Sequence, residues 1–175
     1  VHRELSLLFL REKKGRAFQH HLMAFAQGEL SRDPRSLLRL VAERAALLAH
    51  LGARRRAYRT FDLSSDVAKS IQARHEYGYI HLLRSILLDQ TSSRHEEVTS
   101  NMNIALRFID SRQDRNAAGL ALVFSLYRDL CRCHFDSVFH KSMQLPELLP
   151  TRNRFSTRAM AIKMLAYSLK GMQNL

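Results

Sequence analysis

The chain has 175 residues, about the length of one domain, and 46% of them are hydrophobic, which is enough to bury a core. Only 3 prolines and 6 glycines interrupt it, so the composition excludes collagen-like, low-complexity and disordered proteins. Against 16 Asp and Glu stand 28 Lys and Arg, a net charge of +12, and this excess predicts a polyanionic partner such as nucleic acid, an acidic protein or an anionic membrane.

Apolar residues recur at helical spacing in the first part of the chain and predict two helices. The first covers about 3–28. Asp33 and Pro34 fit the N-cap and the first position of the second helix, because the N–H that proline lacks has no helical partner there. This second helix is expected to end at Gly52 and the arginine run 54–56.

The middle of the chain predicts two more helices. Capping residues at 64–66 precede a third helix over about 66–90. Ser93 and Glu96 then match a capping box, in which each side chain bonds the backbone amide of the other. The fourth helix that follows has apolar residues at spacings of four, four and three: Val98, Met102, Leu106 and Ile109.

The strongest amphipathic pattern of the chain follows a polar break at 112–115 and predicts a long fifth helix that ends before Pro146 and Pro150. Core positions are expected among Phe124, Tyr127, Leu130 and Phe135. A last helix over about 156–172 has an apolar face with Met160, Met164 and Tyr167.

No stretch of the sequence alternates polar and apolar residues over the length of a strand, and no Asn-Gly or Asp-Gly hairpin turn is present. The sequence therefore predicts an all-α protein, a compact bundle of five to six helices. We expect a single domain over 1–175, with 52–65 as the place for a hinge.

Short catalytic and cofactor motifs are missing from the sequence. Without clustered glycines no loop can bring several backbone amides to a phosphate, and no G-x-S-x-G nucleophile turn exists. His75 and Glu76 begin a zinc-protease motif, but Tyr79 stands where its second histidine is needed. We therefore predict that the chain is not an enzyme, and we expect no catalytic residue and no cofactor.

The two cysteines are too few and too close together for a disulfide framework, which predicts a reducing compartment. Cys131, Cys133 and His134, with His140 beyond them, form the one cluster with metal-ligand chemistry. Residues two apart on a helix point about 200° apart, so Cys131 and Cys133 cannot share an ion there. We therefore predict no metal site.

Neither secretion nor membrane insertion is expected. The longest early apolar run, 5–10, is too short for the core of a signal peptide. It is also far short of the ~20 residues that a membrane-spanning helix needs.

The basic residues form three groups with few compensating acids. A single charge run is often only a solvated helix end, but three groups favour contacts with phosphate, because each contact releases counterions. Tyr58, Phe61 and Phe155 beside these groups are candidates for stacking on unpaired bases and equally candidates for the core. The predicted nucleic-acid-binding residues are Arg11, Lys13, Lys14, Arg16, Arg54, Arg55, Arg56, Arg59, Arg152, Arg154 and Arg158.

Residues 121–130 contain Leu126, Tyr127 and Arg128 within a helical apolar pattern, and this segment resembles the opening helix of the LYR-motif family. Members of that family are small, basic, helical mitochondrial proteins that serve as adaptors or subunits in assembly, commonly by docking acyl carrier protein. The resemblance covers about a third of the chain. It implies that Leu126, Tyr127 and Arg128 contact a partner. It further implies that Tyr127 and Arg128 lie near the phosphopantetheine arm of the carrier, with Arg158 on the next helix facing its acidic surface.

Charge and helicity together predict a non-enzymatic, basic helical subunit or assembly factor of a larger complex, which binds RNA or an acidic partner protein. The leading expectation is a mitochondrial ribonucleoprotein or a mitochondrial assembly intermediate. One alternative is an adaptor of the LYR type that docks acyl carrier protein. Others are a helical regulator or effector in the bacterial cytoplasm that binds a protein partner, and an enzyme whose site follows no short motif.

Overall fold

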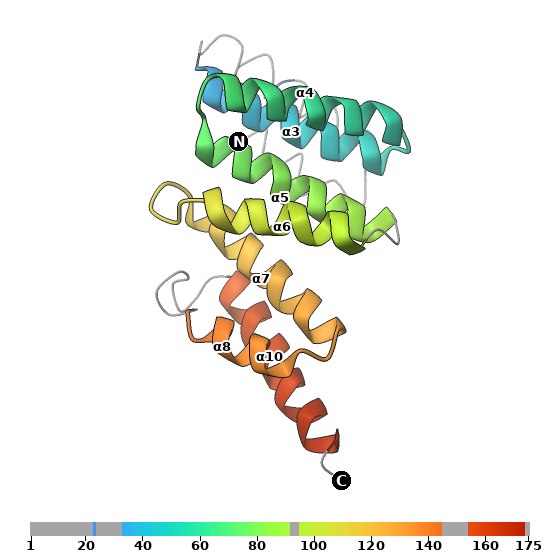
Figure 1. Cartoon of the computed structure of the whole chain (residues 1–175), viewed down its shortest axis with the longest axis vertical. Helices are drawn as coiled ribbons and strands as arrows, with labels where there is room; N and C mark the ends of the chain where they lie inside the picture. The colour runs from blue at the N-terminus through green and yellow to red at the C-terminus, as the bar shows by residue number, and fades with distance from the viewer. Residues whose placement is uncertain (1–22, 24–32, 92–94, 145–153, 174–175) are drawn as a thin grey trace. The chain divides into compact units, whose positions relative to one another are not determined.

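The computed structural model describes residues 23, 33–91, 95–144 and 154–173. Seven helices and the turns between them account for nearly all of these residues, and no strand occurs among them (Figure 1). The expectation of an all-α protein is confirmed, although the described residues already contain seven helices rather than five to six. The helices are α3 Pro34–His50, α4 Arg54–Ser70, α5 Arg74–Thr91, α6 His95–Phe108, α7 Arg115–Cys131, α8 Phe135–Ser142 and α10 Arg154–Gln173.

The packing divides the chain into two compact units, residues 1–108 and residues 109–175. The sequence predicts one domain with a hinge at 52–65, whereas α4 covers 54–70 and the division falls after residue 108. In the first unit α3 packs on α4 and α5, α4 also packs on α5, and α5 packs on α6. In the second unit α7, α8 and α10 pack on one another in pairs.

The start of α3 is the start that the sequence predicts. The Asp33 carboxylate accepts hydrogen bonds from the backbone amides of Arg35 and Ser36, at 3.1 and 3.2 Å, and Pro34 occupies the first helical position. The hydroxyl of Ser36 also donates to this carboxylate and, with the two amides, lowers the pKa of Asp33 below its usual value. Two amides at the helix start that would otherwise lack a partner are thereby satisfied.

Three helix ends in the structure use the same turn, but the sequence predicts only one of them. After α3, Gly52 has φ +90° and the amide of Ala53 donates to the carbonyl of Leu48, at 2.9 Å. After α4 and α7 the residue with positive φ is not glycine but Gln72, at 54°, and Cys133, at 58°. The amides that follow donate five residues back in the same way, from Ala73 to Ala68 and from His134 to Asp129.

These two turns correct the predicted helices. The expected helix over 66–90 is two helices, α4 and α5, because the chain reverses at Gln72. The expected long fifth helix is also two, α7 and α8, because the chain reverses at Cys133. A side chain in the left-handed region costs about 1 to 2 kcal/mol, so neither residue type signals a helix end as glycine does.

The core of the first unit combines small and large side chains. Phe61 is completely buried, and alanines where the helices meet allow close approach of the backbones around it. Tyr58 and Tyr77 pack against this cluster from its edge. The buried members are Leu38, Ala42, Ala45, Ala49, Ala57, Phe61, Ala68, Ala73, Ile80 and Leu87.

In the core of the second unit, the buried residues of the fifth and the last predicted helix differ in part from those that the sequence predicts. Phe135 is buried and Leu130 packs against the cluster as predicted, but Tyr127 is 48% exposed. On α10 the packed residues include Ala159 and Ala166, while Met160, Met164 and Tyr167 are exposed. The sequence of α10 is apolar on several sides, so periodicity alone does not identify the face that packs, and the alanines permit the closest approach. The buried members are Leu122, Leu126, Phe135, Val138, Ala159 and Ala166.

The fourth helix occurs where the sequence predicts it, as α6. Val98 and Met102 are buried as expected, but Leu106 is exposed. The capping box at Ser93 and the predicted helix over about 3–28 lie outside the described residues. Within the residues that the structure describes, no helix is long and apolar enough to cross a bilayer.

Candidate nucleic-acid interface

The arginine run that the sequence places at the end of one helix begins another. Arg54, Arg55 and Arg56 form the first turn of α4, and Arg59 follows one turn later; all four side chains are exposed. The first turn contains no acid, and Ala53 offers no side-chain cap. Among the described residues none of the four arginines takes part in an ion pair. Cations at this end of a helix oppose its dipole, so a bound anion would stabilise them.

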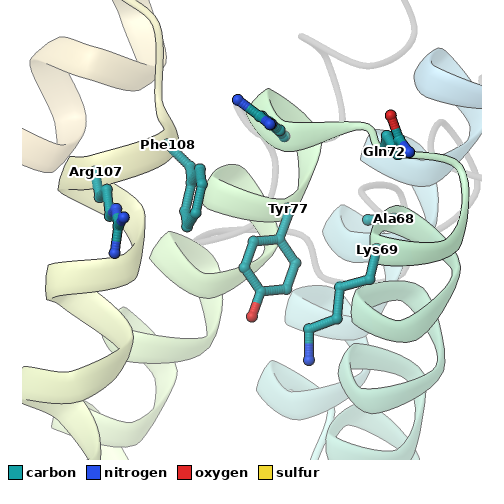
Figure 2. Close-up of a pocket in the computed structure, with 7 residues that line it drawn as sticks. Ala68, Lys69, Gln72, Tyr77, Arg107 and Phe108 are labelled. Atoms are coloured by element: carbon teal, nitrogen blue, oxygen red, sulfur yellow. The ribbon is translucent and has the colours of Figure 1, made fainter.

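A pocket lies near the opposite end of α4, within the first unit (Figure 2). Its volume is about 520 Å³, in the range of small-molecule sites. The last turns of α4, the Gln72 turn, the first turns of α5 and the end of α6 supply its walls. The lining residues are Ala68, Lys69, Gln72, Arg74, Tyr77, Arg107 and Phe108.

Two aromatic rings and three cations determine the chemistry of this pocket. The rings of Tyr77 and Phe108 meet edge to face, with centroids 5.6 Å apart and an interplanar angle of 76°. Lys69 Nζ lies 5.3 Å from the centroid of the Tyr77 ring, and the Arg107 guanidinium lies 5.5 Å from that of Phe108. Arg74 is the third cation, and no carboxylate lines the pocket. Such a pocket attracts an anion that also has an apolar or flat part.

A chain of buried hydrogen bonds lies beside the pocket and joins α4, α5 and α6. The Asn101 amide nitrogen donates to the carbonyl of Glu97, at 2.7 Å, so its oxygen faces His81 Nδ1, at 2.6 Å. Nδ1 therefore carries the proton, and Nε2 accepts from the Ser65 hydroxyl, at 3.3 Å. Burial is the main cause that lowers the pKa of His81, which keeps the ring neutral as this arrangement requires.

Ser65, His81 and Asn101 have the order of a nucleophile, a base and an orienting group, but their placement favours a structural role. Their side chains are only 6%, 7% and 6% exposed, and Ser65 does not line the pocket. The rings of Tyr77 and His81 meet edge to face, with centroids 4.4 Å apart. The hydrogen-bond chain thus holds three helices in register and fixes one wall of the pocket.

The other predicted nucleic-acid-binding residues belong to the second unit or lie outside the described residues. Arg158 is exposed on α10 in the second unit, and Arg154 belongs to the first turn of the same helix. Five predicted residues lie outside the described residues: Arg11, Lys13, Lys14, Arg16 and Arg152. The side chains of Arg154 and Phe155 are likewise not described.

Two of the three aromatic residues that are candidates both for base stacking and for the core belong to the core. Phe61 is completely buried, and Tyr58 packs against the core of the first unit. Both follow the arginine run on α4, but an amphipathic helix turns its aromatic side chains towards its packing partners. The aromatic rings that line the pocket are those of Tyr77 and Phe108, which reasoning from the sequence does not select.

The three residues of the LYR resemblance occupy different environments on α7. Leu126 is completely buried, Tyr127 is 48% exposed and Arg128 is 7% exposed. The sequence places Tyr127 among the expected core positions, but in the structure Tyr127 is exposed and the next residue, Arg128, is buried. Two acids close to Arg128 in the sequence pair with lysines: Asp129 with Lys141 and Asp136 with Lys170, each at 2.6 Å.

The remaining candidate residues take ordinary positions. Cys131 and Cys133 are free, exposed thiols, and no group of three ligating side chains occurs among the described residues. Tyr79, which replaces the second histidine of the zinc-protease pattern, donates from its hydroxyl to Glu43 Oε1, at 2.9 Å. His75 and Glu76 are buried beside it on α5. This part of α5 thus contributes to helix packing.

Comparison with known proteins finds no family model, no curated protein and no solved structure that matches this chain.

Proposed function

We propose that this chain is a non-enzymatic, basic helical subunit or assembly factor that binds RNA within a larger complex, and that a mitochondrial ribonucleoprotein is its setting. The observation that carries the proposal is the grouping of cations in the first unit. Exposed arginines begin α4, and a second group lines the pocket near its other end. Among the described residues neither group has a carboxylate partner.

The chemistry of the two groups favours RNA over other polyanions. Arginine forks form paired hydrogen bonds with phosphate oxygens, and contacts with a regularly charged backbone gain affinity by releasing counterions. Single-stranded RNA also offers unstacked bases, and the pocket is lined by the aromatic rings of Tyr77 and Phe108. An acidic protein would use the cations but not these rings.

The experiment compares RNA binding of the full chain with that of an Arg54→Gln, Arg55→Gln, Arg56→Gln variant over a range of salt concentrations. If the three arginines neutralise phosphates, the dependence of log affinity on log salt should flatten by about 2 to 3, since each neutralised phosphate adds about 0.7 to 0.9 to the slope. Fluorescence anisotropy with a labelled single strand measures this slope.

A matched control removes the same charge elsewhere: Arg35→Gln, Arg112→Gln, Arg115→Gln, all at exposed positions. Its slope should stay close to that of the unaltered chain. If both variants change equally, net charge alone accounts for binding and the proposed interface is wrong. If the unaltered chain binds an acidic protein but no RNA, the proposal is wrong and a protein partner takes its place.

A second candidate function is the acyl-carrier adaptor that the LYR resemblance implies, and the exposure of Tyr127 favours it, since the tyrosine of the motif is available to a partner. Co-purification of a phosphopantetheine-bearing protein with the unaltered chain, and its absence with Tyr127→Ala, would support this candidate. Repeated purification without such a protein would remove it.

A further inference from the structure

The pocket between α4, α5 and α6 is assembled from residues far apart in the sequence. Figure 2 shows the ring of Tyr77 between Phe108 on one side and the side chain of Lys69 on the other. Lys69 comes from the last turn of α4, Tyr77 from the start of α5 and Phe108 from the end of α6. Three helix ends therefore converge on one small volume, which is the arrangement of a ligand site rather than of a helix surface.

The charge of the pocket is one-sided. Lys69, Arg74 and Arg107 line it, and none of them takes part in an ion pair among the described residues. Lys69 and Arg107 lie over aromatic rings instead, which holds a cation only weakly at an exposed site. A phosphate group in the pocket would form shorter, charge-assisted hydrogen bonds with the cations that reach it.

The apolar part of the pocket suits a flat ring. A cation lies over one face of each aromatic ring, so that face becomes accessible to a base when the cation moves from it to a phosphate. A base can stack on such a face, and the amide of Gln72 and the hydroxyl of Tyr77 can hydrogen-bond to its edge or to a ribose. Both groups belong to lining residues.

The walls are held in place before any ligand arrives. The ring of His81 packs edge to face with that of Tyr77, and His81 is itself held by hydrogen bonds with Asn101 and Ser65. Arg84 on α5 adds ion pairs to α4 and α6, at 2.6 Å to Asp62 and 3.2 Å to Glu97. The helices that form the walls therefore need no rearrangement when a ligand binds.

We infer that this pocket binds one nucleoside phosphate, with the phosphate held by Lys69, Arg74 and Arg107 and the base stacked against Tyr77 or Phe108. The inference deepens the proposed RNA-binding function, and it rests on that function where the nucleotide belongs to an RNA strand. A free nucleotide has the same chemistry, so the test includes both sources.

The first experiment titrates the full chain with adenosine monophosphate, ribose phosphate, adenosine and inorganic phosphate, and follows binding by calorimetry at low salt. Adenosine monophosphate should bind about tenfold or more tightly than ribose phosphate, which lacks the base, and than adenosine, which lacks the phosphate. Equal affinity for adenosine monophosphate and inorganic phosphate would overturn the inference, because the rings would then have no part in binding.

Two variants test the named residues. Phe108→Leu should reduce affinity for adenosine monophosphate towards that for ribose phosphate, and Lys69→Gln with Arg107→Gln should reduce affinity for both phosphates. The matched control is Arg112→Gln with Arg115→Gln, which removes the same charge outside the pocket and should leave both affinities unchanged. Circular dichroism and the melting temperature show that each variant is folded. An undiminished affinity in the folded Phe108→Leu variant would overturn the stacked geometry.

A comparison of the affinities for hexaadenylate and for adenosine monophosphate shows whether the nucleotide belongs to an RNA strand or is free. If the pocket binds a nucleotide of an RNA strand, hexaadenylate should bind more tightly than adenosine monophosphate. The Arg54→Gln, Arg55→Gln, Arg56→Gln variant should lose this difference in affinity while it still binds adenosine monophosphate. Binding of adenosine monophosphate without any binding of RNA supports the pocket and removes the proposed function. Arginine-dependent RNA binding without any binding of adenosine monophosphate removes the pocket and leaves the proposed function intact.

Discussion

The two units join their helices with polar groups in different places. In residues 1–108 the joining groups lie inside: Ser65, His81 and Asn101 connect three helices, and each is less than a tenth exposed. In residues 109–175 the joining groups are ion pairs nearer the surface: the side chains of Lys141 and Asp129 are 30% and 15% exposed, and those of Lys170 and Asp136 are 44% and 90% exposed.

This difference has a physical consequence. A buried polar group costs free energy unless its partner is present, so the first unit tolerates only the helix register that completes its hydrogen bonds. An exposed ion pair contributes at most about 1 kcal/mol and imposes little. The unit with the internal polar groups is also the one with the candidate ligand pocket, whose walls need a fixed position.

The largest effect is expected from Phe61→Ala in the core of the first unit. Phe61 is completely buried on α4, and its truncation should cost about 3 to 5 kcal/mol, because apolar burial decreases and a cavity remains. If the two units unfold separately, hydrogen exchange should accelerate over 33–91 and 95–108 but not over 115–142 and 154–173. Leu126→Ala, at a completely buried position of the second unit, is the reciprocal control. Acceleration over the whole chain in both variants would show that the two units unfold as one.

The second prediction concerns pH and tests whether the internal hydrogen bonds of the first unit depend on a neutral histidine. Burial lowers the pKa of His81 in the folded chain below its unfolded value of about 6.5, and the nearby cations Arg84 and Lys69 lower it further, while the hydrogen bond with Asn101 opposes them. Between the two pKa values the unfolded chain binds more protons than the folded chain. The free energy of unfolding should therefore fall as pH drops below about 6.5 towards the folded pKa.

Denaturant unfolding at several pH values checks this, with His81→Gln as the variant and His134→Gln as the control. The pH dependence below about 6.5 should weaken in His81→Gln and persist in His134→Gln, because His134 is exposed. Identical pH dependence in all three proteins would contradict a neutral, buried His81.

The sequence predicts those features of this fold that depend on neighbouring residues. The Asp33 cap, the end of α3 at Gly52 and the buried face of α6 at Val98 and Met102 follow from local spacing and residue type. On α7 the same reasoning fails, because Tyr127 and Arg128 are adjacent and only the position of the neighbouring helices decides which of them is buried.

The candidate site could be predicted only in part for a related reason. The arginine run on α4 is contiguous in the sequence, so it is visible there as a cation group. Lys69, Tyr77 and Phe108 are separated by up to 39 positions in the chain and share no motif. They meet only because two helix ends, one of them at Gln72, bring the chain back on itself, and a left-handed glutamine leaves no signal in the sequence.

The smallest effect is expected from substitutions at the turns with positive φ, which lie at Gln72 in the first unit and at Cys133 in the second. Gln72→Gly in the first unit and Cys133→Gly in the second should each raise the free energy of unfolding by up to about 1 kcal/mol, because glycine adopts positive φ without steric cost. Gly52→Ala, at φ +90°, should lower it by a similar amount, although no neighbouring atom would touch the added methyl group. Chemical denaturation measures all three. A decrease of stability in Gln72→Gly would mean that its side chain contributes more to the pocket wall than its backbone conformation costs, and adenosine monophosphate affinity should then fall in the same variant.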